Sequence, residues 1–258
     1  MALRPLLTRA GTLRNGVIPV ALLAICVQVI PSGAVAQGMA SAVPGLSGVW
    51  DRRGIVGETR PMQLTARAIG FGQAFDEVLS PRYDCSPAAA PFIIRDPYNF
   101  SVEQLEDRVL LRYEKDDVLR TVWLRGFEHP EPGPYDFTIQ GHSVGWYEGD
   151  RLIVETTKFV FDPIGLANTG NVPSSTLKKV TERYWRDGNS LMAEVTTEDP
   201  LILSEPYAFR FRWELTEVGL ESYDCDPELA RFPARFQPSN YRDPDWVRLP
   251  SQPPTVNP

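Results

Sequence analysis

Hydrophobic and polar residues alternate one by one along several stretches of this chain. The clearest stretch is residues 207–214, in which every odd-numbered residue is aromatic and every even-numbered residue is alanine, arginine or glutamate. Successive side chains of a β-strand point to opposite faces of a sheet, so this pattern predicts a strand with one buried and one solvated face. A helix would spread both kinds of residue around its circumference, which excludes a helix here.

Other stretches alternate less cleanly, and tight turns join two pairs of them. The turns are Glu-Gly-Asp at residues 148–150 and Asp-Gly-Asn at residues 187–189. Such residues tolerate the positive φ that a tight hairpin needs. We expect residues 137–146 to pair with residues 151–158 across the first turn. In total about eight to ten strands are expected between residues 47 and 223. The remaining clear candidates are residues 108–114, 118–125, 178–185 and 191–197.

One helix is expected among these strands, at residues 65–79. Thr65 is a good N-terminal cap and alanines follow it, although Gly70 and Gly72 lower the helix propensity. Strands and helices do not alternate along the chain, which excludes doubly wound and (β/α)8 folds. The sequence therefore predicts an all-β fold: an antiparallel meander closed into a lipocalin-like β-barrel, with a β-sandwich as the alternative and one short N-terminal helix. Closure is favoured because it removes exposed sheet edges.

The beginning of the chain has the features of a secretory signal peptide. Three arginines precede an apolar run at residues 17–30, and an Ala-Val-Ala cleavage pattern follows at residues 34–36. The apolar run is shorter than the about 20 residues needed to span a bilayer. No later stretch of the sequence is long or apolar enough to span one. We expect a signal peptide at residues 1–36, a β-barrel domain at residues 37–235 and a proline-rich C-terminal tail at residues 236–258.

Charge and cysteine content indicate the surroundings of the mature chain. Removal of residues 1–36 takes away three arginines and no acidic residue, so the net charge changes from −7 to −10. Surfaces that bind nucleic acid or anionic lipid are basic, so neither is an expected partner. Cys26 leaves with the signal peptide, and Cys85 and Cys225 remain as a pair in an exported chain. This predicts a disulfide between them and a periplasmic or secreted location.

His142 is one of only two histidines and lies in a Gly-His-Ser-Val-Gly stretch, which fits the letters of the G-x-S-x-G nucleophile elbow. The elbow requires a strand, a sharp turn and a helix, with a histidine further along. Here a hairpin follows, and no histidine comes after His142, so a serine hydrolase is not expected. His142 could itself act as a general base, because an unperturbed pKa of about 6.5 suits proton transfer. The simpler interpretation, which we prefer, is a hydrogen-bonded strand histidine beside Trp146.

Charged residues gather around the predicted turn at residues 114–120. Glu114, Asp117 and Arg120 are the candidates to act with His142 if the protein is an enzyme. The simpler interpretation, which we prefer, is a solvated turn whose ion pairs contribute little to stability. In the alternative, Arg120 points inward and pairs with a carboxylate such as Glu114, because buried charges persist only when they are paired.

The sequence has enough aromatic residues to line an apolar pocket. The alternative for each aromatic residue is a place in a packed core. Arg183 and its neighbour Glu182 face opposite ways on a strand, so either can face the core; we prefer a solvated place for both. The histidines and cysteines lack the spacing of a zinc site, so neither a metal nor a cofactor is predicted. The candidate ligand-binding residues are Trp123, Trp146, Tyr184, Arg183 and Phe211.

Residues 141–159 resemble the signature of a large family of secreted bacterial proteins without an assigned function. The signature is G-H-S-[IV]-G-x-[WY]-E-G-D-x-L-[IV]-V-[DE]-T-x-x-F, and the chain follows it throughout. Family members often have a histidine at the position of Ser174, so a shared two-histidine chemistry is not expected here. The resemblance implies export and a common fold. Weaker similarities lie at residues 84–87, 97–98, 113–120, 182–184, 198–200 and 223–225.

These observations predict an exported β-barrel that binds a small, largely apolar molecule in an aromatic-lined pocket. One alternative is an enzyme on the same scaffold, using His142 and a carboxylate for proton transfer in an isomerase, cyclase or lyase reaction. A second alternative is a structural protein of the cell envelope with a filled core. The state of the barrel interior separates these possibilities, since only the first two need a cavity.

Overall fold

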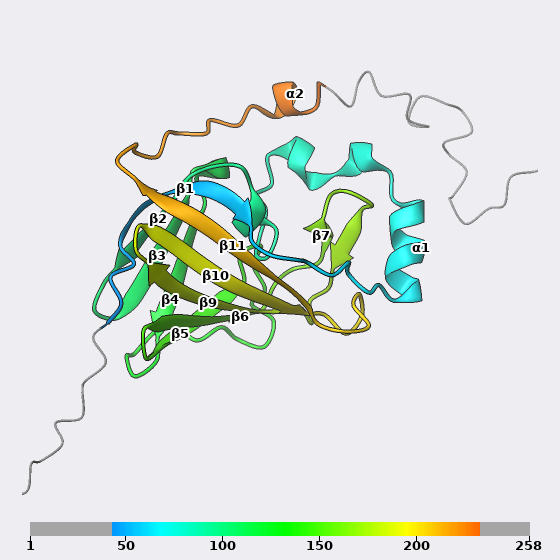
Figure 1. Ribbon diagram of the computed structural model, residues 1–258. Coiled ribbons are helices and arrows are strands. Elements are labelled where there is room, and N and C mark those ends of the chain that lie inside the picture. Colours follow the sequence, from blue (N-terminus) through cyan, green and yellow to red (C-terminus); the bar gives the residue numbers. More distant parts are fainter. Residues whose placement is uncertain (1–42, 233–258) are drawn as a thin grey trace, which may run out of the picture. The chain divides into compact units, whose positions relative to one another are not determined.

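The computed structural model of the protein describes residues 43–232 (Figure 1). The predicted signal peptide (residues 1–36) and the proline-rich tail (residues 236–258) lie outside the described residues. Within residues 43–232, no helix combines the length and the apolar character that a membrane crossing requires.

Nine strands of the described chain form a closed β-barrel, which confirms the all-β prediction and rules out the sandwich. Around the barrel the strand order is β1-β11-β10-β9-β6-β5-β4-β3-β2, and β2 closes the circle by pairing with β1. The strands are β1 (Gly48–Ile55), β2 (Phe100–Gln104), β3 (Arg108–Tyr113), β4 (Leu119–Leu124), β5 (His142–Glu148), β6 (Arg151–Thr157), β9 (Lys179–Asp187), β10 (Ser190–Glu198) and β11 (Tyr207–Thr216).

One connection breaks the expected antiparallel order, and two others, β1–β2 (residues 56–99) and β6–β9, insert long segments between antiparallel neighbours. Between β4 and β5, residues 125–141 return the chain to the end at which β4 begins, so β4 and β5 are parallel neighbours. Between β6 and β9, the chain forms a separate two-stranded sheet of β7 (Asp162–Ala167) and β8 (Val172–Ser174). The predicted hairpins β5–β6 and β9–β10 are both present, with Gly149 and Gly188 at positive φ in their turns.

The predicted helix is present but shorter than expected. Helix α1 (Ala66–Ala74) begins after Thr65, whose side chain accepts a hydrogen bond from the backbone N–H of Ala68 at 3.2 Å. Gly72 allows the helix to approach the β7–β8 turn, because a Cβ there would lie 2.7 Å from the carbonyl oxygen of Gly170. The other helical segments are η1 (Glu77–Leu79), η2 (Pro81–Asp84), η3 (Ile93–Arg95), η4 (Lys115–Asp117) and α2 (Pro227–Ala230).

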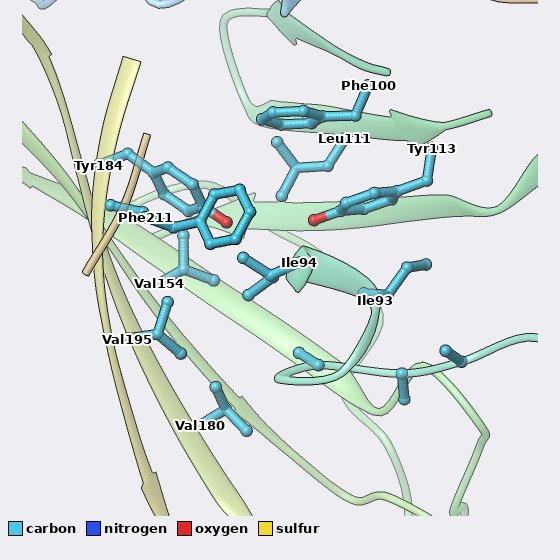
Figure 2. Close-up of a cluster of buried hydrophobic side chains, with 14 of the residues drawn as sticks. Ile93, Ile94, Phe100, Leu111, Tyr113, Val154, Val180, Tyr184, Val195 and Phe211 are labelled. Atoms are coloured by element: carbon cyan, nitrogen blue, oxygen red, sulfur yellow. The ribbon is translucent and has the colours of Figure 1, made fainter. Parts of the chain in front are cut away.

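A plug of residues 88–94 packs against the barrel core, and Ala88, Ala89 and Ala90 of this segment are buried. Ile93 and Ile94 are both buried, and Figure 2 shows Ile94 among side chains that come from the barrel strands. The odd-numbered aromatic residues of β11 are buried as predicted, and the ring of Phe211 lies 4.6 Å from that of Trp213. Phe211, which was expected to line a pocket, thus belongs to the packed core.

A buried ion pair lies inside the barrel. Arg120 of β4 is 2 % exposed and Glu182 of β9 is 0 % exposed, and two guanidinium nitrogens of Arg120 donate to the two carboxylate oxygens at 2.7 and 3.2 Å. Tyr184 donates a further hydrogen bond to Glu182 at 2.5 Å, while Arg120 also donates to Tyr113 and Thr156, each at 3.2 Å. The preference for a solvated Arg120 and Glu182 was therefore wrong. The partner of Arg120 is Glu182, and Glu114 plays no part in the pair.

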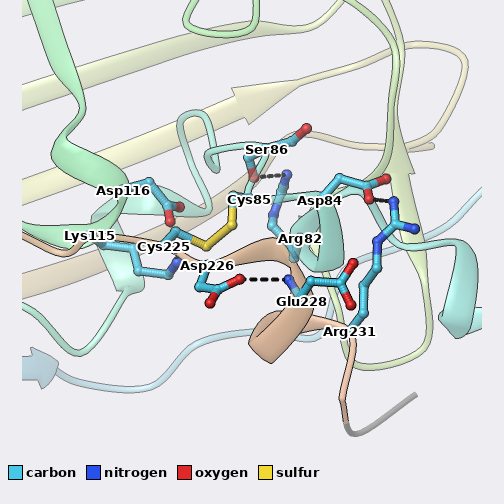
Figure 3. The surroundings of a disulfide bond; sticks show 10 residues. All are labelled: Arg82, Asp84, Cys85, Ser86, Lys115, Asp116, Cys225, Asp226, Glu228 and Arg231. Atoms are coloured by element: carbon cyan, nitrogen blue, oxygen red, sulfur yellow. Dashed lines mark hydrogen bonds and ion pairs between the residues drawn. A yellow bond between two sulfur atoms is a disulfide. The ribbon is translucent and has the colours of Figure 1, made fainter. Parts of the chain in front are cut away.

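The predicted disulfide between Cys85 and Cys225 is confirmed, and it fastens the segment after β11 to the segment before the plug (Figure 3). Cys85 follows η2 in a left-handed conformation, and Cys225 precedes α2. A second contact between the same two segments is the ion pair of Arg231 with Asp84. In the chain-entropy description, a bond across 140 residues stabilises the fold by up to about 5 kcal/mol.

The buried ion pair leads to a stability prediction. Replacing Arg120 by methionine leaves the Glu182 carboxylate buried without its partner, so we expect a loss of about 3–5 kcal/mol in the free energy of unfolding, measured by urea denaturation. Arg112→Met, at an exposed position of the neighbouring strand β3, should change it by less than about 0.5 kcal/mol. The double variant Arg120→Met/Glu182→Met should recover part of the loss. Equal stability of Arg120→Met and Arg112→Met would contradict the pair's role.

Candidate functional site

A pocket of about 180 Å³ lies where β6 ends and the chain approaches β9. Its wall comes from four parts of the chain: η2 with the segment before the plug, the end of the β4–β5 connection, the β6–β7 segment, and the residue before β9. Most of the lining side chains are apolar, and the charged ones are Arg82, Asp162 and Lys178. The apolar and small lining residues are Pro81, Ser86, Pro87, Ala89, Ile139, Val160, Phe161 and Pro163.

Arg82 and Asp162 form an ion pair that holds two walls of the pocket together. The guanidinium of Arg82 donates to a carboxylate oxygen of Asp162 at 2.7 Å. It also donates to the backbone carbonyl oxygens of Ser86 and Pro87 at 3.3 and 3.2 Å. Asp162 in turn accepts from the backbone N–H of Ile164 at 3.0 Å, which fixes the start of β7. The charge of Asp162 is thus already matched within the wall.

Lys178 is the unusual residue of the pocket, because its amine is buried without a hydrogen-bond partner. The residue is 1 % exposed. Its Nζ lies 4.0 Å from the centre of the Phe159 ring, which offers a cation–π contact and no hydrogen bond. A buried donor without a partner costs about 1–3 kcal/mol, and more when it is charged. A second buried donor without a partner, Nε of Arg82, belongs to the same wall.

Burial lowers the pKa of Lys178 to about 7, and the carboxylates of Asp162 and Asp199 oppose this shift. Asp199 does not pair with the amine, because it accepts hydrogen bonds from the backbone and the side chain of Ser175 at 2.6 and 2.7 Å. Near neutral pH the amine therefore exists in both its charged and its neutral form. A ligand with a negative or hydrogen-bond-accepting group would favour the charged form.

His142 begins β5, and the second histidine, His129, is close to it. The two imidazole rings lie 5.6 Å apart, and Glu131 is the nearby carboxylate. Burial lowers the pKa of His142, while Glu131 acts in the opposite direction and His129 in the same direction. The predicted carboxylate partners, Glu114 and Asp117, lie instead beside residues 221–223, whose backbone N–H groups donate to them at 3.4 and 3.5 Å. The structure thus does not assemble the predicted catalytic group.

The candidate ligand-binding residues do not gather in one place. Tyr184 and Phe211 lie in the barrel core, and Tyr184 donates to Glu182. Trp123, Trp146 and Arg183 are partly exposed. The guanidinium of Arg125 covers the ring of Trp146 at 3.4 Å, and Trp123 stacks on His129.

Ser143, the serine of the G-x-S-x-G letters, confirms that no nucleophile elbow exists at this position. It lies within the regular strand β5, is buried, and shares a 2.8 Å hydrogen bond with Thr156 of the neighbouring strand β6.

Sequence reasoning missed Lys178, Arg82 and Asp162. Lys178 is the first residue of a predicted strand and is followed by Lys179, so the pair looks like an ordinary solvated strand end. Lys179 does behave in this way, since it is 39 % exposed and pairs with Glu155. The burial of one lysine could have been inferred from the positions of the pair. If the strand begins at residue 178, two consecutive lysines point to opposite faces, so one of them faces inward.

Comparison with known proteins gives little beyond the fold. No family model and no curated protein matches the chain, so membership of the secreted family remains a prediction. Among solved structures, the chain is similar to a point mutant of the fluorescent protein UnaG. The match has 15 % identity and a TM-score of 0.33, and it covers 66 % of this chain and 96 % of that one. A likeness this distant indicates no function for the chain.

The burial of Lys178 predicts a specific pH dependence of stability. The pKa of Lys178 is about 7 in the folded protein and 10.5 in its ordinary state, so the unfolded chain holds one more proton between these values. The cost of burying the charge is complete below pH 7 and is relieved as the pH rises, by about 1.4 kcal/mol per pH unit.

Urea denaturation between pH 6 and 10 measures this contribution as a difference between variants. Lys178→Met should be more stable than the wild type at pH 6, and the difference should shrink as the pH rises. Lys179→Met serves as the control and should differ from the wild type by a constant amount. A difference between Lys178→Met and wild type that does not vary with pH would show that the amine is not buried as a charge.

Proposed function

We propose that this protein binds a small molecule that is mainly apolar and carries one negatively charged or hydrogen-bond-accepting group, in the pocket beside Lys178. The observation that carries the proposal is the amine of Lys178, buried in the pocket wall without a hydrogen-bond partner. Burying an unpaired lysine lowers stability, and an apolar residue of similar size would avoid that cost. Binding of a ligand that completes its contacts is the function that such a residue supports.

The lining of the pocket indicates the chemistry of the ligand. Apart from the Arg82–Asp162 pair and Lys178, the wall is made of proline, alanine, isoleucine, valine, phenylalanine and serine. A volume of about 180 Å³ leaves room for a molecule considerably larger than a single water. A short-chain carboxylate, or the acidic end of a longer molecule, fits both the volume and the chemistry.

This site differs from the pocket that the sequence suggested, because it lies at the end of the barrel and not within the aromatic interior. A packed interior alone would favour the alternative of a purely structural protein. The unpartnered Lys178 favours binding over that alternative, since a structural barrel has no need for a buried amine. The enzyme alternative with His142, Glu114 and Asp117 has no support in the geometry, because these residues contact different parts of the chain.

We also propose that the protein is exported to an oxidising compartment. The disulfide between Cys85 and Cys225 supports this location, since such bonds persist outside the reducing cytosol. Cys85 directly precedes Ser86 and Pro87 of the pocket wall, so the bond also stabilises the site itself.

Titration calorimetry with a carboxylate and a matched alcohol tests the binding proposal. At pH 6, hexanoate should bind the wild type, and Lys178→Met should weaken its binding at least about tenfold, since a hydrogen bond to a charged group contributes about 1.5–3 kcal/mol. Hexanol should bind both proteins within about twofold of each other, which corresponds to less than about 0.5 kcal/mol. The affinity for hexanoate should fall between pH 6 and 9, because Lys178 loses its charge around pH 7.

Lys179→Met is the matched control, because Lys179 is the neighbouring lysine and faces solvent. It should leave hexanoate binding unchanged. The proposal fails if Lys178→Met and Lys179→Met have the same effect. It also fails if no straight-chain carboxylate from butanoate to octanoate binds the wild type at pH 6.

A further inference from the structure

Both histidines of the chain and one carboxylate lie together outside the barrel interior. His129 and Glu131 belong to the β4–β5 connection, and His142 is the first residue of β5. One donor atom from each residue can be chosen so that all three lie within 4.8 Å of one another. In particular, Nε2 of His129 lies 3.4 Å from a carboxylate oxygen of Glu131.

We propose that His129, Glu131 and His142 bind a divalent transition-metal ion such as Zn²⁺. Two imidazoles and one carboxylate are a known ligand set for zinc and for other first-row metals. Donor atoms that share one tetrahedral ion at bonds of about 2.0–2.2 Å lie about 3.3–3.6 Å apart. The three residues therefore need to approach one another by up to about 1.5 Å. The Glu131 side chain is 75 % exposed, so it has room to make that movement.

The local sequence holds His129 and Glu131 in the conformation that such a site needs. Each of the two is followed by a proline, Pro130 and Pro132, and a residue before proline is restricted to extended backbone. In extended backbone, residues two apart point to the same side. The side chains of His129 and Glu131 thus point to the same side, and little backbone conformational entropy is lost when both bind one ion. Lys158 anchors the connection further along by donating to two of its carbonyl oxygens at 3.2 and 3.1 Å.

The imidazole of His129 is oriented by two neighbours, as is usual for a metal ligand. Its ring stacks on Trp123 of β4 with 5.9 Å between centroids and an angle of 15°. Its Nδ1 lies 3.3 Å from the carbonyl oxygen of Pro130. In the tautomer with the proton on Nδ1, His129 donates to that oxygen. The lone pair of Nε2 is then free to coordinate a metal ion next to Glu131.

His142 provides the second independent observation, because its Nε2 is buried and has no hydrogen-bond partner. The position of this ring is set by the backbone: Gly141 has a φ of +69°, and a Cβ there would lie 2.5 Å from the carbonyl oxygen of Thr157. Only glycine therefore fits before His142. A buried ring nitrogen without a partner costs about 1–3 kcal/mol, and coordination of a metal would remove that cost.

The donor set also indicates which ions should bind. Imidazole suits zinc, copper, nickel and iron, whereas Mg²⁺ and Ca²⁺ prefer a shell of oxygen ligands. Three protein ligands leave at least one coordination position of a tetrahedral ion open. The exposure of Glu131 places that position near solvent, where water or a donor atom of a ligand can reach it.

The test uses the full mature chain, stripped of metal, and Zn²⁺ alone as the probe. Titration calorimetry should show one Zn²⁺ bound per chain, with no competition from Mg²⁺. His129→Ala, His142→Ala and Glu131→Gln should each weaken Zn²⁺ binding by more than about 100-fold. Losing a residue that only hydrogen-bonds to a metal ligand costs about 10- to 100-fold, and losing a ligand itself should cost more. Co²⁺ should give the visible absorption of a low-coordinate site in the wild type and lose it in each variant.

Glu128→Gln is the matched control, since Glu128 is an exposed glutamate of the same connection. It should bind Zn²⁺ as the wild type does. Thermal unfolding supplies a second readout: Zn²⁺ should raise the melting temperature of the wild type and of Glu128→Gln, but not that of Glu131→Gln. Because Glu131 is exposed, its variant should fold even if a histidine variant does not. Absence of saturable binding, or binding that survives Glu131→Gln unchanged, would overturn the proposal.

Discussion

The ion pair of Arg120 with Glu182 constrains how the barrel interior can be used. Two charges removed from water need both each other and further hydrogen bonds, and the barrel provides these from Tyr113, Thr156 and Tyr184. The plug of residues 88–94 and the aromatic residues of β11 fill the space around the pair. An interior that is occupied in this way holds the strands in register, and the proposed binding groups lie on the connections between strands.

The groups on which the two proposals rest lie on long connections between strands. The β4–β5 connection brings His129 and Glu131 to His142, and the β6–β9 connection brings Asp162 to the pocket in which Lys178 lies. The barrel acts as a rigid frame for both, which agrees with the general observation that binding residues sit on loops held by a scaffold. Each proposal rests on a polar atom that is buried without a hydrogen-bond partner: Nε2 of His142 and Nζ of Lys178.

Local pattern was enough to predict the hairpins, the buried face of β11, the start of α1 and the disulfide, because each depends on nearby residues or on simple counting. The parallel pairing of β4 with β5 and the plug could not be predicted, since the connection between the two strands and the plug have no hydrophobic period. Arg120 was misplaced because its partner, Glu182, lies on β9, which β5 and β6 separate from β4, so the two side chains meet only across the barrel interior. Lys178 was missed because its burial depends on residues 81–89, which are distant in sequence. The His-Pro-Glu-Pro stretch at residues 129–132 was visible, but the approach of His142 to it was not.

The central claim is that small molecules bind at the end of the barrel and not among the packed side chains of its interior. Titrating hexanoate into protein labelled with ¹³C at the isoleucine and valine methyl groups, followed by NMR, tests it most directly. The account predicts that the methyl signals of Ile139 and Val160, in the pocket wall, shift with saturation. Those of Val154 and Val195, in the buried core, should stay in place. Saturable shifts of the core methyls without shifts at the pocket would contradict the account.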